Sequence, residues 1–271
     1  MVIGAWRSGE PMVEELEEAA AVAAHHLEEL SPLPNRDRVP LTWENEHNNP
    51  AARHLPTVFN YMCAAVKATG DCNLTPMAAV AGAIADLTVD VLCGRGATKA
   101  FANNGGDIAV QVGQGEKIVT GIVSSLATGT ITHTLTLTSR ENIGGIATSG
   151  LGGRGFTKGV ADAVVVLAAN ARLADACATH IANSTLIETP EVLQVKAETL
   201  DPQTDLSGQM VTKTVQPLPK PMILQALEKG EESAIRLINK DVIKGAFIFI
   251  QGQMLAVPTS FLELTREVTR E

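Results

Sequence analysis

The sequence has few aromatic residues, few charges for its length and no long apolar run. Aromatic residues make up 3% of the 271 residues, and charged residues make up 19%, below the roughly 25% typical of soluble domains. The two most apolar stretches, 78–92 and 160–174, contain charged side chains and fall short of the roughly 18 apolar residues that a membrane-spanning helix needs. The first residues lack the charged start and apolar run of a signal peptide. We therefore expect no membrane segment.

Cysteine and positive charge are also scarce. The four cysteines form no C-x-x-C pair, which favours reduced thiols in a cytoplasmic protein over a disulfide framework or a zinc site. Lys and Arg together number 21 against 30 for Asp and Glu, a net charge of −9. Because nucleic-acid binding draws its affinity from Lys and Arg, this balance argues against a nucleic-acid partner.

The residue pattern predicts an α+β fold in which helices pack on antiparallel sheets. The expected helices are 10–30, 55–69 and 77–92, with two short ones at 221–229 and 231–239. Thr75 is expected to cap the helix at 77–92, and Asn170 is expected to cap a further helix that runs to about residue 183. The expected strands are 98–103, 107–112, 117–124, 131–139, 143–148, 161–168, 244–250 and 253–257. Proline-rich text at 31–54 predicts a loop, and 184–218 is expected to be irregular. We expect one domain over 1–271, and the alternative is an arrangement of two packed lobes, one helical (1–95) and one sheet-rich (96–271).

A turn at Asn104, Gly105, Gly106 and Asp107 is the first candidate for chemistry. Two glycines permit positive φ angles and let a ligand approach the backbone closely. Asn-Gly is also a strong hairpin signal, so a simple turn is the alternative. Asp107 directly after the second glycine is more than such a turn requires.

The second candidate is the glycine-rich stretch 147–159, which lies between two expected strands. Its backbone amides, beginning at Thr148, Ser149 and Gly150, suit an anion nest, and Arg154 and Lys158 add positive charge. The stretch lacks the order of a P-loop, in which a helix follows directly. A phosphate-binding loop and a flexible solvent loop are the two interpretations.

The third candidate is the pair Asp175 and Thr179, four residues apart on an expected helix. This spacing places their oxygens on one helix face. A carboxylate and a hydroxyl, completed by carbonyl, water and phosphate oxygens, suit Mg²⁺. The alternative is a buried aspartate that hydrogen-bonds a neighbouring turn.

Five segments together resemble the uncharacterised bacterial and archaeal ApbE-related family, a distant relative of the ApbE flavin transferases. These segments are 74–85, 102–109, 145–150, 174–179 and 200–206. The transferases bind FAD and, with Mg²⁺, move its FMN half onto a Thr or Ser of an acceptor protein, releasing AMP. The resemblance therefore implies an α+β fold, Mg and FAD as cofactors, and a flavin or nucleotide and an acceptor protein as partners. A homodimer is a further possibility.

The resemblance also assigns roles to residues. Asp175 and Thr179 match the metal positions of the transferases, and the backbone carbonyl of Ala83 falls in the stretch that supplies another ligand. The turn at 104–107 and the segment 148–150 match parts of the nucleotide site, and Arg154 and Lys158 lie in the loop expected to hold phosphates.

Two positions depart from the transferase pattern. Asp86 stands where transferases usually carry Lys, and the place of their histidine-bearing segment holds 154–159, which has no histidine. A non-catalytic flavin- or nucleotide-binding module, serving a reductase partner, is therefore the alternative to a flavin transferase.

Overall fold

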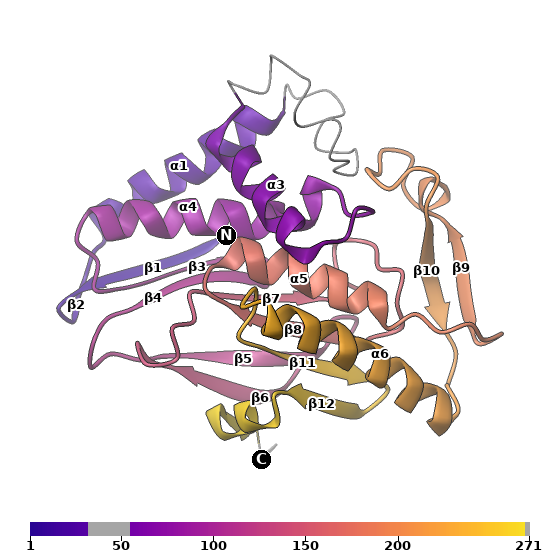
Figure 1. Ribbon diagram of the computed structural model, residues 1–271. Coiled ribbons are helices and arrows are strands. Elements are labelled where there is room, and N and C mark those ends of the chain that lie inside the picture. Colours follow the sequence, from indigo (N-terminus) through magenta and orange to yellow (C-terminus); the bar gives the residue numbers. More distant parts are fainter. Residues whose placement is uncertain (32–54, 269–271) are drawn as a thin grey trace.

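A computed structural model describes residues 1–31 and 55–268. An eight-stranded antiparallel sheet runs through the molecule in the order β12-β11-β8-β7-β4-β3-β1-β2 (Figure 1). Its strands are β1 (Val2–Arg7), β2 (Glu10–Pro11), β3 (Lys99–Asn104), β4 (Asp107–Val112), β7 (Gly145–Ser149), β8 (Ala163–Ala168), β11 (Gly245–Ile250) and β12 (Gln253–Val257). The expected α+β architecture of antiparallel sheets and packed helices is confirmed.

Helices cover one face of this sheet. They are α1 (Glu14–Leu30), α3 (Thr57–Thr69), α4 (Val80–Gly94), α5 (Ala171–Ser184) and α6 (Lys220–Asn239), with the short helix η2 (Pro76–Ala79) before α4. α4 packs on β3 and β4, α5 on β7 and β8, and α6 on β11 and β12 (Figure 1). α5 is thus the central helix of the layer, in contact with α3, α4 and α6.

A smaller sheet lies against the other face. It consists of β5 (Ile118–Ser125), β6 (Thr130–Leu137) and β13 (Thr265–Glu267). β8 is buried on both sides: Val164 and Val166 pack in the core with α5 and α6, whereas Val165 and Leu167 pack in the core with the small sheet. A strand buried on both faces has a continuous apolar sequence rather than an alternating one, as 163–168 does.

Several local predictions are wrong. The first helix begins at Glu14 rather than residue 10, because Glu10 and Pro11 pair with β1, a strand that was not predicted. The region 184–218, expected to be irregular, contains the hairpin β9 (Val192–Lys196) and β10 (Met210–Val215), whose exposed Leu193 and Met210 obscure the alternation of a half-buried sheet.

The two short helices expected at 221–229 and 231–239 are one continuous helix, α6. Gly230, which suggested a break, is a packing position instead. A side chain there would come within 2.8 Å of Ile248 Cδ1 and 3.2 Å of Thr185 Cγ2, so glycine lets α6 lie close to β11 and to the end of α5. The expected loop 31–54, with His47 and His54, lies mostly outside the described residues.

The helical stretch Pro76–Gly94 is long and apolar enough, by composition, to cross a membrane, with a mean hydropathy of 1.6. In the fold, 56% of this stretch is buried, as is typical of a core helix. Asp86 is one of the buried residues of this stretch. Its carboxylate oxygens accept hydrogen bonds from the first amides of α5, Ala171 N at 2.8 Å and Arg172 N at 3.0 Å. The Arg172 guanidinium donates to the same carboxylate at 2.8 Å.

We predict that Asp86→Ala destabilises the protein strongly, because it leaves two amides at the start of α5 and one guanidinium without their acceptor. Breaking a buried charge pair from one side costs about 3–5 kcal/mol. Urea unfolding should show this loss, while Glu228→Ala, at an exposed position on α6, should change the free energy of unfolding by less than about 0.5 kcal/mol. Equal stability of the two variants would contradict the role given to Asp86.

Candidate functional site

The start of α5 fixes the position of the candidate metal residues. Asn170 caps the helix, with its Oδ1 accepting a hydrogen bond from Leu173 N at 3.1 Å, as the sequence predicted. Asp86 holds the two preceding amides from the neighbouring α4. Because both ends of this first turn are anchored, Asp175 one turn later has a defined direction.

The Asp175 carboxylate points at the first turn of α4. Its Oδ2 accepts a hydrogen bond from Gly82 N at 2.9 Å, and the amide of Ala81 also donates to this carboxylate. Gly82 is fully enclosed, and a side chain there would overlap the carbonyl group of Ala171. Glycine therefore permits the close contact between α4 and α5 that brings Asp175 to these amides.

The Asn-Gly-Gly-Asp turn lies at the same place. Asn104 Nδ2 donates to the carbonyl oxygen of Ala81 at 3.2 Å, and Gly105 and Gly106 have φ angles of +79° and +118°. Asp107 Oδ1 accepts a hydrogen bond from Thr148 N, at the end of β7, at 3.3 Å. The turn is a hairpin between β3 and β4, and the Asp107 charge acts on Asp175 of α5.

The end of β7 connects this turn to α5. Thr179 Oγ1 donates to Ser149 Oγ at 3.5 Å, so the second residue of the Asp175–Thr179 pair meets the first residues of the glycine-rich stretch. Gly150 follows with a φ of +145°, packed against the carbonyl oxygens of Ala161 and Asp162. Three motifs that are far apart in the sequence thus meet at one side of α5.

Two carboxylates dominate the electrostatics of this site. Burial raises the pKa of Asp107 to about 7, although the Thr148 amide and the Arg154 charge lower it. Burial and the neighbouring Asp107 charge raise the pKa of Asp175 well above its ordinary value, against the amides of Gly82 and Ala81. Each carboxylate disfavours ionisation of the other, as like charges in one site do.

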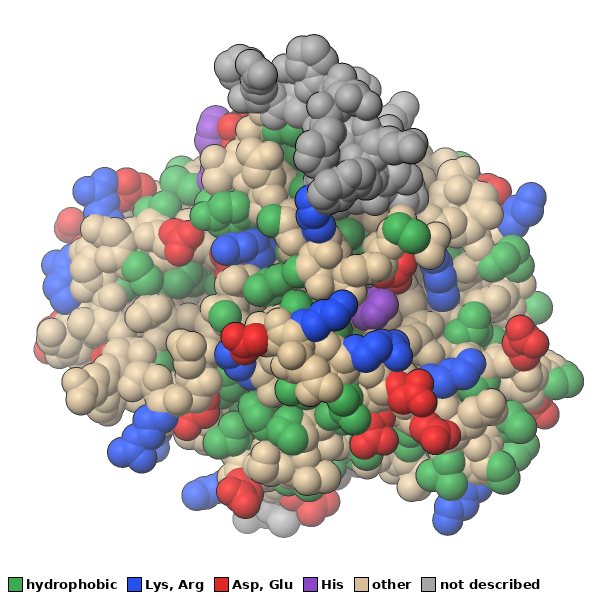
Figure 2. Space-filling view, in the orientation of Figure 1, with side chains coloured by type: hydrophobic (Ala, Val, Ile, Leu, Met, Phe, Trp, Pro, Cys, Tyr) green, Lys and Arg blue, Asp and Glu red, His purple; other side chains and the backbone are tan. Residues whose placement is uncertain are grey.

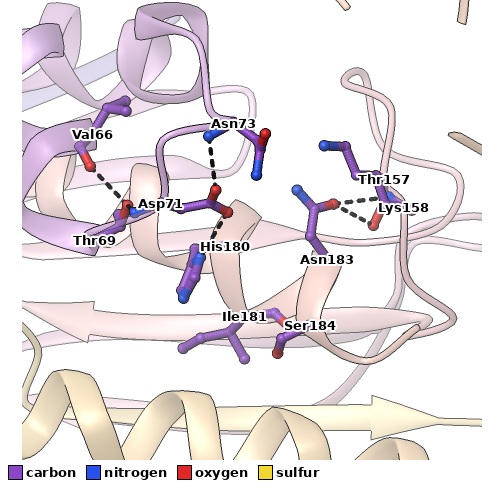
Figure 3. Close-up of polar contacts among 10 residues, drawn as sticks. All are labelled: Val66, Thr69, Asp71, Asn73, Thr157, Lys158, His180, Ile181, Asn183 and Ser184. Atoms are coloured by element: carbon purple, nitrogen blue, oxygen red, sulfur yellow. Dashed lines mark hydrogen bonds and ion pairs between the residues drawn. The ribbon is translucent and has the colours of Figure 1, made fainter. Parts of the chain in front are cut away.

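The two cations of the glycine-rich stretch lie in different places. The Arg154 guanidinium lies against Gly105, at a point where a side chain on that glycine would collide with it, and its charge reaches Asp107. Lys158 instead lies beside the C-terminal half of α5. Its backbone amide donates to Asn183 Oδ1 at 2.8 Å, and its charge lowers the pKa of Asp71 (Figure 3). The structure therefore brings Arg154, but not the Lys158 side chain, to the Asp107 carboxylate.

A histidine–aspartate pair lies beside Lys158 and was not predicted. His180 Nδ1 and Asp71 Oδ2 are 3.1 Å apart, and the His180 contact lowers the pKa of Asp71 to about 2 (Figure 3). Asp71 comes from the loop after α3, more than one hundred positions before His180. No sequence pattern links them, although His180 directly follows Thr179.

The donor set suits Mg²⁺ better than a transition metal. The described residues contain no group of three or more His, Cys, Asp and Glu side chains that could hold a metal ion. Asp175 and Thr179 would instead contribute one carboxylate and one hydroxyl, with other oxygens supplied by backbone, water or ligand. Ala83 is fully buried in the first turn of α4. In a helix, the carbonyl oxygen of such a residue normally accepts a hydrogen bond from the backbone amide four residues later, so this oxygen has a role in the helix itself.

The surface over α5 and α6 carries both signs of charge. Figure 2 shows cationic and acidic side chains interspersed around a histidine on this face, rather than a field of one sign. A ligand bound here would therefore be held by individual contacts, not by a broad positive potential.

We predict that Asp107 makes the protein less stable as the pH rises. Its folded pKa of about 7 exceeds the ordinary value of 3.8, so between these pH values the folded state binds more protons than the unfolded state. This group lowers the free energy of unfolding by at most about 1.4 kcal/mol per pH unit over that window. Urea unfolding at pH 4 to 8 should show that Asp107→Asn gains stability relative to the parent as the pH rises. A constant difference would contradict this prediction.

Comparison with known proteins identifies the family. A family model described as AbpE bacteria matches residues 1–256. Among curated relatives, a UPF0280 protein of Methanococcoides burtonii is 39% identical over 132 residues, 48% of this chain and 53% of the relative. One from Methanosarcina acetivorans is 30% identical over 185 residues, 68% of this chain and 66% of the relative. The chain spans about half the length of the first of these relatives.

Two solved structures are also similar. The ApbE protein of Thermotoga maritima has a TM-score of 0.45 and 15% identity, over 94% of this chain and 79% of the other. The flavinyl transferase ApbE of Pseudomonas stutzeri, in its apo form, has a TM-score of 0.40 and 16% identity, over 97% of this chain and 76% of the other. Because the family model covers nearly the whole sequence, the chain belongs to the AbpE bacteria family.

Proposed function

We propose that this protein binds a flavin nucleotide such as FAD together with Mg²⁺, and that it transfers the FMN half of FAD to a hydroxyl of an acceptor protein. The observation that carries the proposal is the meeting of Asp107 and Asp175 beside Thr179 and Ser149. Two carboxylates that oppose each other's ionisation form a site that gains from a bound cation. The family relationship to ApbE supports the choice of a flavin nucleotide.

Asp175 and Thr179 are the proposed metal ligands, and Asp107 is close enough to add negative charge. When bound, Mg²⁺ supplies neutralisation of the charge that develops on the pyrophosphate. The exposed Arg154, which lies against Gly105, is proposed to contact phosphate oxygens from the side of the glycine turn. The Gly150 amide and the Ser149 hydroxyl are proposed to orient the same phosphates, since the Thr148 amide already donates to Asp107 Oδ1.

In the proposed reaction, the oxygen of the acceptor hydroxyl forms a bond to the phosphorus of the FMN half. The bond between that phosphorus and the bridging oxygen of FAD breaks, and AMP leaves with the bridging oxygen. The hydroxyl proton passes to solvent or to a base. Water in place of the acceptor would give free FMN and AMP.

A second candidate is binding without turnover, and the role of Asp86 favours it. Transferases usually carry Lys at this position, whereas here the Asp86 carboxylate holds the first amides of α5 and the Arg172 guanidinium. The lysine, whose charge a transferase could direct at phosphate, is therefore replaced by Asp86, which holds α4 and α5 together. This candidate predicts saturable FAD binding with no AMP formed.

We predict that incubation with FAD and Mg²⁺ releases AMP, and that Asp175→Asn abolishes the release because it removes the negative charge of the proposed metal ligand. Chromatography of the nucleotides measures AMP, and calorimetry measures FAD binding in the same samples. Asp90→Asn, at an exposed position on α4, is the matched control and should behave like the parent. FAD binding without AMP would select the second candidate, and absence of FAD binding by the folded, Mg²⁺-supplemented parent would overturn both.

We also predict that Mg²⁺ stabilises the protein more at pH 8 than at pH 5. Burial raises the pKa of both Asp107 and Asp175, so at the lower pH protons compete with the metal for these carboxylates. Thermal unfolding with and without Mg²⁺ at each pH measures the difference. Asp175→Asn should remove most of the Mg²⁺ effect, and an equal Mg²⁺ effect at both pH values would contradict the carboxylate site.

A further inference from the structure

The side chains around the C-terminal half of α5 form a second polar cluster, distinct from the carboxylate site. Asn73, Lys158 and Asn183 come from three separate segments, and Figure 3 shows their side chains directed toward a common space. Asn183 lies one helical turn beyond Thr179 and two turns beyond Asp175, about 12 Å along the axis of α5. The cluster and the carboxylate site therefore lie along the same side of one helix.

The orientation of the Asn183 amide is fixed by its neighbours. Its Oδ1 accepts hydrogen bonds from Lys158 N at 2.8 Å and from Thr157 Oγ1 at 3.3 Å. With the oxygen occupied in this way, the NH₂ group must face the opposite direction, toward Asn73 (Figure 3). Among the described residues this NH₂ group has no hydrogen-bond acceptor.

Among the described residues, the hydrogen bonds of Lys158 and Asn73 are made by their backbone groups. The carbonyl oxygen of Lys158 accepts hydrogen bonds from Thr212 Oγ1 at 2.8 Å and Gln194 Nε2 at 3.0 Å. Asn73 N donates to Asp71 Oδ1 at 2.9 Å. Within the described part of the chain, neither the Lys158 ammonium nor the Asn73 amide group makes a hydrogen bond. The cluster is thus rich in N–H donors on anchored segments.

The cluster has an acidic neighbour as well as a cation. The Asp71 carboxylate, 3.1 Å from His180 Nδ1, lies close enough to Lys158 for their charges to interact, and α5 ends here with its carbonyl groups. The carboxylate and the helix carbonyl groups disfavour a phosphate, which carries full negative charge, and leave the N–H donors to neutral oxygen acceptors. Carbonyl oxygens on the edge of a heterocyclic ring have that chemistry.

We propose that Asn73, Asn183 and Lys158 form a second ligand subsite whose N–H donors bind the carbonyl-bearing edge of a heterocyclic ring. The inference rests on the proposed function, since the ring is the one carried by a nucleotide whose phosphates lie at the Asp175 end of α5. The cluster then determines which ring is accepted, whereas the carboxylate site and Arg154 bind the part common to all nucleotides.

The test compares FAD, which has a carbonyl-bearing flavin ring, with ADP, which has the same adenosine diphosphate part and no flavin. Calorimetric titration in the presence of Mg²⁺ should give FAD binding about tenfold weaker for Lys158→Met and about fivefold weaker for Asn73→Ala, because each change removes hydrogen-bond donors. ADP binding should be unchanged in both variants. Lys213→Met, an exposed lysine on the adjacent β10, is the matched control and should bind both ligands like the parent.

Each other outcome overturns a defined part of the inference. Equal weakening of FAD and ADP would show that the cluster holds phosphate or supports the fold, and unchanged FAD binding in both variants would show that it forms no subsite. A parent protein that binds neither ligand would overturn the proposed function and this subsite with it. The melting temperatures of the unliganded variants, expected to equal that of the parent, separate lost contacts from lost folding.

Discussion

The contact between the first turn of α4 and the first turn of α5 is the constraint on which the rest of the site depends. Gly82 leaves no room for a side chain beside Ala171, and Asp86 one turn later fixes the amides that begin α5. These two residues set the distance and the direction of the two helices. Asp175 reaches the Gly82 amide only because the helices are this close.

This arrangement places negative charge where it is costly. Asp86, Asp107 and Asp175 all have raised pKa values because burial removes them from water, and Asp175 is also affected by the other two carboxylates. Asp86 is compensated by two amides and by Arg172, whose guanidinium also lies 4.0 Å from the centre of the Tyr61 ring. Asp107 and Asp175 have fewer partners among the described residues, and such uncompensated charge is typical of functional sites.

The sequence predicted the elements that carry strong local signals. The apolar 163–168 strand, the Asn170 cap of α5 and the Asn-Gly hairpin all have short-range causes, namely continuous burial, a side-chain oxygen at a helix start and positive φ angles. The i, i+4 spacing of Asp175 and Thr179 was likewise enough to place both on one helix face. These features need no information from distant parts of the chain.

Other features depend on contacts between distant segments and could not be predicted. Thr75 was expected to cap a helix with its hydroxyl, but that hydroxyl donates to Asp205 instead, 130 positions away. Gly230 separates the two helices that were expected, and the reason for glycine there is its packing against Ile248, which lies in a strand later in the sequence. The Asp71–His180 pair likewise joins two distant segments, and no local sequence pattern predicts the contact.

The separation of Arg154 from Lys158 shows how such contacts change a functional interpretation. In the sequence, two cations four residues apart in a glycine-rich stretch suggest one phosphate site. In the fold, Arg154 lies on Gly105 near Asp107, whereas the backbone of Lys158 is fixed by Asn183 and the β9–β10 hairpin. The two cations therefore do not form the single phosphate site that their spacing suggests. In the proposed function they contact different parts of the nucleotide, Arg154 its phosphates and Lys158 its ring.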